Sequence, residues 1–454
     1  MKRGLIAVII IVILASFISV ALYAQSDKPL KDALSFYEAA MSKIDTDNIH
    51  YRIMVQKETT IADETYNEES IKTVHAKEFN GELSAYSEEQ LLINGEAISV
   101  QEWFLNNTLY ATLNNSCFST KMEAEIFRGR SLPFLILEPS LYKTISGLRN
   151  EKGYTIYFST ASAPEAWITD TINTFDFLEA EAEFSKDGTL RSLKYSANYQ
   201  ETQRNVKLSV TTQFISAFPD IPALDGSKAT ANVSPDIAIL LEKACCMILA
   251  SKNTTSVYHE NILCEVFGDR QTKDVNITVD NSSSWTSSIK TEVSISNTGK
   301  SGAGSKITKE EHFSDDQYTM SINGTIVTPE NQVTERDIRR SIRDMLISTV
   351  ALPDDITSCT ITQADHDITY TFTANQFLSA QLKENALSVL YGDPNILSPE
   401  TDMYQTQESV FYLVLDAVTK LPKASGFRYS GMYTINGLQY QLEYTAHQEY
   451  ALLN

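Results

Sequence analysis

Apolar and polar residues alternate along most of the chain after residue 50, and a two-residue period is the pattern of half-buried β-strands. These stretches are rich in Thr, Ser, Tyr, Val and Ile, most of which favour extended backbone. Clear examples cover residues 154–158, 368–372 and 438–444. The pattern therefore predicts strands for most of the chain.

Helical spacing, with an apolar residue at every third or fourth position, occurs in fewer segments. Pro29 and Pro235 each begin such a segment, and proline suits the first turn of a helix. The apolar stripes are Leu30, Ala33, Leu34, Tyr37, Met41 and Ile44 in the first, and Ile237, Leu240, Leu241, Ala244, Cys245 and Ile248 in the second. Thr334 to Asp337 resembles a capping signal before a helix whose inward face is Ile338, Ile342, Met345 and Leu346. Further helices are predicted over residues 375–390, 122–130 and 164–171.

The order of these features indicates a duplication. Similar residues recur in the same order in the two halves, at a separation that grows from 206 to 234 residues. The matching pairs are Pro29 and Pro235, Tyr51 and Tyr258, Tyr110 and Tyr318, Phe158 and Phe372, and Tyr195 and Tyr429. A separation that only grows is what small insertions in a second copy produce.

Strand runs interrupted by a few helices are typical of α+β proteins with an antiparallel sheet. We expect an α+β fold of two tandem repeats, each a curved antiparallel β-sheet (half-barrel) packed on helices, preceded by one N-terminal hydrophobic helix. The predicted divisions are residues 1–27 for a membrane anchor or signal peptide, 28–220 for the first half-barrel-like domain, 221–234 for a linker and 235–454 for the second. The proline-containing stretch 218–222 should be extended and stiff, and each half is long enough to fold alone.

The N-terminus predicts export. Lys2 and Arg3 precede an uncharged run from Leu5 to Ala24, and twenty helical residues span about 30 Å, the thickness of a bilayer core. The basic pair should stay in the cytoplasm, so the bulk of the chain faces outward. Two alternatives remain: an uncleaved single-pass anchor in the cell membrane, or a signal peptide cut near Ala21 or Ala24 that leaves a secreted protein. Lipid anchoring is excluded, because the first cysteine is Cys117.

Charge limits the kinds of binding partner that the chain is expected to have. The 454 residues carry 37 Lys and Arg against 58 Asp and Glu, a formal net charge of −21. Such a surface repels nucleic acid, so no nucleic-acid partner is expected. The acidic surface either serves only to keep the protein soluble through self-repulsion, or it binds a cation or a basic protein.

Motifs for chemistry are weak throughout. The stretch Gly299-Lys300-Ser301 lacks the spacing and the following helix of a phosphate loop. None of the six histidines has a helical zinc spacing, and Asp365-His366-Asp367 resembles a turn. The acidic doublets, such as Glu310-Glu311, would point to opposite faces of a strand. Cys117, Cys245, Cys246, Cys264 and Cys359 form no Cys-x-x-Cys motif, although Cys245 and Cys264 could meet in one core. We therefore expect no enzyme activity, no cofactor, and no catalytic or metal-binding residue, and the ligand-binding residues remain unassigned.

An exported chain with an N-terminal helix, Tyr- and Thr-rich strands, and late helices between strands resembles the lipoprotein-carrier superfamily. The strand pair Trp103-Phe104 to Tyr110 contributes to this resemblance, which extends over residues 28–454. It implies a non-enzymatic binding protein for a lipid or another hydrophobic ligand, held in an apolar cavity. The alternative is a cell-envelope interaction or sensory domain without a cavity, bound to another envelope protein. The superfamily has no catalytic motif, so no residue role is carried over.

Overall fold

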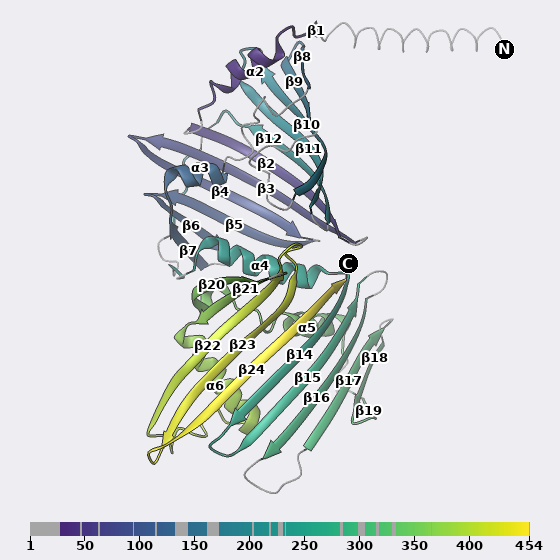
Figure 1. The fold of residues 1–454 in the computed structure, drawn as a ribbon, viewed down its shortest axis with the longest axis vertical. Helices are drawn as coiled ribbons and strands as arrows, with labels where there is room; N and C mark the ends of the chain where they lie inside the picture. The colour runs from purple at the N-terminus through teal and green to yellow at the C-terminus, as the bar shows by residue number, and fades with distance from the viewer. Residues whose placement is uncertain are drawn as a thin grey trace, which may run out of the picture.

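The structure is a computed structural model (Figure 1). It describes residues 28–453 except 46–47, 62–63, 94, 114–115, 132–143, 161–171, 202–203, 218, 226–229, 232, 282–284, 298–304, 315–316, 329–332 and 365. The predicted N-terminal helix, the segment 164–171 and the Gly299-Lys300-Ser301 stretch therefore lie outside the described residues. Within them, no helix combines the length and the apolar character that crossing a bilayer requires.

The first half contains one large sheet and two described helices. The helices are α2 (Ala33–Met41) and α3 (Ala124–Ser131). The strands are β1 (Lys28–Pro29), β2 (Asn48–Ile61), β3 (Glu64–Phe79), β4 (Glu82–Ile93), β5 (Glu96–Leu105), β6 (Thr108–Leu113), β7 (Ser116–Lys121), β8 (Thr144–Arg149), β9 (Gly153–Thr160), β10 (Ile172–Ser185), β11 (Leu190–Glu201), β12 (Arg204–Phe214) and β13 (Thr230–Ala231).

The second half follows α4 (Pro235–Ala250). Its other helical segments are α5 (Glu335–Leu346), the short 3-10 turn η3 (Pro353–Asp355) and α6 (Gln376–Tyr391). The strands are β14 (Asn253–Cys264), β15 (Asp269–Asp280), β16 (Thr286–Asn297), β17 (Ser305–Ser314), β18 (Gln317–Ile322), β19 (Thr325–Val327), β20 (Ile356–Ala364), β21 (Asp367–Ala374), β22 (Met403–Asp416), β23 (Pro422–Ile435) and β24 (Leu438–Leu453).

The two sheets share one strand order. The first, of 13 strands, runs β1-β8-β9-β10-β11-β12-β2-β3-β4-β5-β6-β7-β13. Written in the matching direction, the second, of 11 strands, runs β20-β21-β22-β23-β24-β14-β15-β16-β17-β18-β19. Apart from β1 and β13, each strand of one sheet has a counterpart at the same place in the other. In both sheets the last long strand pairs with the first long strand, so β12 lies beside β2 and β24 beside β14 (Figure 1).

The expected α+β fold, with each sheet packed on helices as a half-barrel, is wrong. The chain is mostly β, with two large antiparallel sheets and few helices in the described residues. The physical reason is the length of the strands, which reach 16 residues in β3 and β24. Their alternating inward side chains supply most of the two cores, and the helices contribute the smaller part.

Two apolar cores are present, and the larger one crosses the boundary between the halves. The smaller core lies inside the first sheet and includes Tyr51, Phe104 and Leu193. The larger core includes Leu91 and Phe118 of the first sheet together with α4 and the inner face of the second sheet. Helix α4 lies between the two sheets and contacts β4 to β7 on one side and α5 and β23 on the other (Figure 1). The division into two domains with a linker stays a prediction.

Candidate functional site

Helix α5 forms one wall of a cavity against the second sheet, and its own sequence sets its start. The Thr334 side chain accepts a hydrogen bond from the Asp337 amide at 3.3 Å, and the Asp337 carboxylate accepts one from the Thr334 amide at 3.2 Å. This is the predicted capping signal, now confirmed as a capping box. Ile338, Ile342 and Leu346 are buried, as the apolar stripe predicted.

The C-terminal end of α5 is tied to the sheet by buried polar groups. Gln448 of β24 donates to Ser256 of β14 at 2.8 Å and to the Met345 carbonyl at 3.2 Å, and accepts from Thr349 at 3.0 Å. Tyr450 donates to the Leu346 carbonyl at 3.0 Å. Because these buried groups satisfy one another, the network fixes α5 in one position over the strands.

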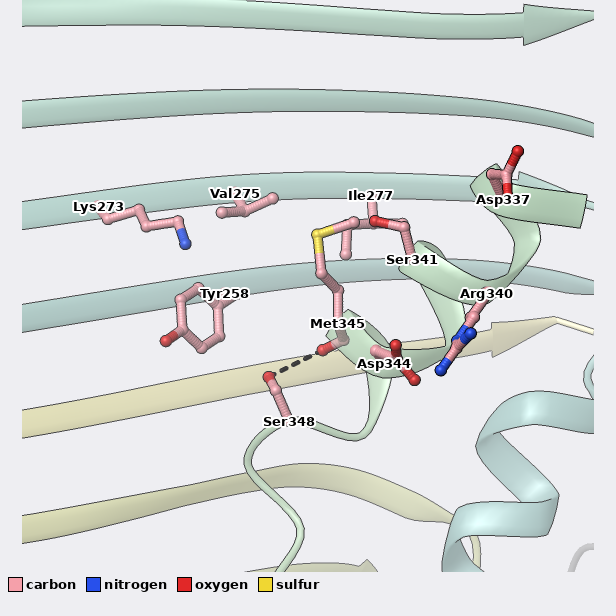
Figure 2. Close-up of a pocket in the computed structure, with 10 residues that line it drawn as sticks. All are labelled: Tyr258, Lys273, Val275, Ile277, Asp337, Arg340, Ser341, Asp344, Met345 and Ser348. Atoms are coloured by element: carbon pink, nitrogen blue, oxygen red, sulfur yellow. Dashed lines mark hydrogen bonds between the residues drawn. The ribbon is translucent and has the colours of Figure 1, made fainter. Parts of the chain in front are cut away.

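A cavity of about 470 Å³ lies between α5 and strands β14 and β15. Figure 2 shows Lys273, Val275 and Ile277 along β15 and Tyr258 on β14, facing the α5 side chains. The apolar floor consists of Val275, Ile277 and Met345, beside the ring of Tyr258. The polar rim from α5 and the turn after it consists of Asp337, Arg340, Ser341, Asp344 and Ser348. The site is therefore amphipathic, and it differs from the apolar lipid cavity that the carrier resemblance implies.

Lys273 is the cation on the sheet side of this cavity. It is half-buried, and its ammonium lies 5.7 Å from the centre of the Tyr258 ring. Among the described residues no carboxylate forms an ion pair with it, although Glu260 is its direct partner across the β14–β15 ladder. The Glu260 carboxylate instead accepts from the Tyr258 hydroxyl at 2.5 Å and from the Tyr444 hydroxyl at 3.3 Å.

Burial, and after it the negative charge of Glu260, raises the pKa of Tyr258 and of Tyr444 well above the ordinary value for tyrosine. Both hydroxyls therefore stay protonated and available as donors to Glu260 at any physiological pH. As a result the Glu260 carboxylate is engaged by two neutral hydroxyl donors.

The first sheet contains an equivalent lysine in a different setting. Val74 pairs with Tyr51, and Val275 pairs with Tyr258, so Lys72 and Lys273 occupy the same place in the two sheets. Lys72, however, is paired at 2.7 Å with the buried Glu102 and at 3.6 Å with Glu89. At the position across from Lys273 where the first sheet has Glu89, the second sheet has Val293. One copy thus neutralises its interior lysine, and the other directs it into a cavity.

Other hollows are less suited to a specific ligand. A cavity of about 250 Å³ on the other side of α5 shares Asp337 and Ser341, and there Tyr318 donates to Glu311 at 2.6 Å. In the first half, a hollow of about 780 Å³ beside the end of α2 has a mixed lining, in which Lys43 and Asp187 stand beside apolar side chains such as Ile44 and Phe214. None of these linings is wholly apolar, and the apolar cavity that the carrier resemblance implies stays a prediction.

The residues singled out from the sequence do not assemble into a site. Asp367 is paired with Lys423 at 2.6 Å, and in the parts of the chain that the structure describes no three metal-ligating side chains converge. Cys245 and Cys264 do share the larger core, but as free thiols. Sequence reasoning missed the Tyr258, Glu260 and Lys273 group. Its signal was a charged pair, Glu260 and Lys273, at the alternating positions of the two strands that also hold Ile262 and Val275.

Comparisons with known proteins leave the chain without a family. No family model matches it, and no curated protein does. Solved structures with some likeness include an AttH-like protein of Nitrosomonas europaea, with 7% identity over 92% of this chain and 97% of that chain, at a TM-score of 0.14. Two Pseudomonas aeruginosa proteins also match: OccK3 (OpdO), with 7% identity over 92% and 99% of the two chains at a TM-score of 0.11, and the outer membrane protein OpdK, with 6% identity over 90% and 100% at 0.12. These TM-scores are too low for any of the three to inform the fold or the function.

Proposed function

We propose that this chain is an exported, non-enzymatic binding protein whose ligand is a small amphiphile with an anionic group. The export segment is Leu5 to Ala24, which would leave the protein anchored in the membrane or secreted into the envelope. The carrier resemblance of the sequence supports a binding role. The ligand class follows from the cavity beside α5.

The observation that carries the proposal is the contrast between Lys72 and Lys273. A half-buried ammonium that forms no ion pair with any carboxylate of the described residues favours an anion, since a charge in a poorly solvated site needs compensation. The neighbouring Val275, Ile277 and Met345 favour an apolar body on the same molecule. Small amphiphilic carboxylates, sulfonates or phosphates combine both features, and the cavity is in the size range of small-molecule sites.

Calorimetric titration of residues 28–454 with decanoate, decanol and decylamine tests this ligand class. We expect decanoate to bind most tightly, and Lys273→Met to weaken decanoate binding by roughly tenfold to a hundredfold, as loss of a charge-assisted hydrogen bond does. Decanol binding should be unchanged by the same substitution.

Arg270→Gln is the matched control, because Arg270 is an exposed cation on the other face of the same strand. Equal decanoate affinity in the wild-type protein and the Lys273→Met variant would refute the role of Lys273. Absence of binding for all three probes would refute the binding function itself.

A further inference from the structure

A row of aromatic side chains crosses the outer face of the first sheet. His50, His75, Tyr86 and Trp103 stand directly opposite one another on β2, β3, β4 and β5. Consecutive ring centres are 5.7, 5.3 and 5.1 Å apart. Neighbouring positions on the same strands point the other way, into the core, so this aromatic row belongs to neither apolar core.

The segment after β12 runs over this row. We call residues 215–225, of which all but 218 are described, the strap. The Ile215 amide donates to the His50 carbonyl at 2.9 Å, and the His50 ring donates from Nδ1 to the Ala217 carbonyl. At the other end, the Trp103 indole donates from Nε1 to the Pro222 carbonyl at 3.0 Å. The strap is thus anchored at both ends of the row by contacts to its backbone.

Burial shows which side of the strap faces the sheet. Ile221 and Leu224 are half-buried, whereas Pro219, Asp220, Pro222, Ala223 and Asp225 are exposed. A three-residue period is that of a polyproline II helix, and the two prolines favour that conformation. Although they lie on the outer face, His75 and Trp103 are only 6% and 5% exposed. Ile221 and Leu224 therefore lie on the covered side of the strap, and its prolines face solvent.

We propose that the aromatic row is a recognition site for a polyproline II segment that carries an apolar residue at every third position, and that the strap is its resident occupant. The chemistry is that of known polyproline sites, in which flat aromatic side chains pack on the extended segment and backbone carbonyls accept hydrogen bonds. A segment of this pattern from another protein competes for the row when the strap is displaced. Because the strap is tethered, its local concentration is in the millimolar range, which suppresses binding of free segments to the intact chain. This site is independent of the cavity beside α5.

The test uses a fluorescein-labelled peptide of residues 215–225 and a scrambled peptide of the same composition. Residues 28–454 with Ile221→Ser and Leu224→Ser should release the strap. We expect this strap-weakened variant to bind the peptide at least tenfold more tightly than the wild-type protein does, with no binding of the scrambled peptide. Adding Trp103→Phe should then weaken peptide binding by threefold to tenfold, because the ring remains but the indole donor is lost.

Hydrogen exchange in the wild-type background provides a second measurement that needs no strap-weakened variant. Trp103→Phe alone should accelerate amide exchange within residues 215–225 and leave exchange in the Lys273 strand β15 unchanged. A strap-weakened variant that is folded by circular dichroism but binds neither peptide, or binds both equally, would overturn the proposal. Unchanged exchange in the strap of the Trp103→Phe variant would overturn it as well.

Discussion

Lys72 and Lys273 show how one position in a repeated sheet can serve two purposes. In the first sheet the lysine compensates Glu102, whose side chain is only 5% exposed and which also accepts from Ser87 at 3.0 Å. In the second sheet no acid of the described residues pairs with the lysine, and the charge is directed toward a cavity. Replacing Lys72 should therefore lower stability, whereas replacing Lys273 should weaken ligand binding and leave stability nearly unchanged.

Lys72→Met should lower the free energy of unfolding by about 3 kcal/mol, because it leaves the buried Glu102 carboxylate without its cation. Lys273→Met should change it by less than about 0.5 kcal/mol, since no ion pair is broken there. Urea denaturation of both variants, followed by circular dichroism, measures the difference. Equal losses in the two variants would contradict the contrast between the sites.

His75 makes stability depend on pH in a defined direction. Burial, and after it the neighbouring His50, lowers the pKa of His75 below its ordinary value of 6.5, while Tyr86 flanks the ring on the other side. The unfolded chain therefore takes up this proton at higher pH than the folded chain does. The stabilisation is complete above pH 6.5 and is lost as the pH falls through the interval from 6.5 to the folded pKa.

We expect the free energy of unfolding to drop less between pH 7.5 and pH 5.5 in His75→Phe than in the wild-type protein. Thermal or urea unfolding at the two pH values measures this. The aromatic replacement keeps the ring contacts of the row, so the comparison isolates the titration. An identical pH dependence in both proteins would rule out His75 as its source.

Among the elements, those with strong local signals could be predicted from the sequence. Helix α5 begins at the predicted capping signal, and α6 occupies nearly the predicted residues 375–390. Leu34, predicted to face inward from α2, is instead 39% exposed, because a periodic stripe shows that a helix has an apolar side but not how wide its contact is. Tyr258, Glu260 and Lys273 lie on one hairpin, but they could not be assigned to a site, since the position of α5 over this hairpin depends on contacts between residues far apart in the sequence.

Thr334→Ala should destabilise the protein by about 1 kcal/mol through loss of the α5 cap. Thr334→Ser keeps the side-chain oxygen and should be close to neutral. Since α5 is one wall of the cavity, hydrogen exchange in residues 335–341 should accelerate in the alanine variant only. Equal melting temperatures for the two variants would show that the cap contributes nothing.

At the scale of the whole molecule, the contacts of α4 with both sheets bear on whether the two halves are independent domains. The sequence shows that α4 has an apolar stripe, but its periodicity could not reveal that β4 to β7 of the preceding sheet contact it. Leu91 and Phe118 belong to the same core as Leu241 of α4, so a fragment of residues 28–220 exposes apolar surface that the intact chain buries. We therefore expect that fragment to be less stable than its own core suggests, and the two halves of the intact chain to be coupled.

Leu241→Ala should cost about 2–5 kcal/mol, as buried Leu-to-Ala changes do, and should accelerate hydrogen exchange in both β4–β6 and β22–β24. Leu193→Ala is the matched control, because Leu193 is equally buried but belongs only to the core of the first sheet. Its effect on exchange should remain within the first half. Confinement of the Leu241→Ala effect to the second half would show that the halves are uncoupled.

The pairing of β14 with β24 also determines when the second sheet is completed. Thr254 pairs with Leu452 and Cys264 with Leu442, so β14 cannot complete its pairing before β24 is available. Contacts between residues so distant in sequence form slowly, because a long loop must close before any pairing energy is gained. Synthesis proceeds from the N-terminus, so β14 keeps one unpaired edge until β24 has been made. The topology thus delays completion of the second sheet until β24 is available to pair with β14.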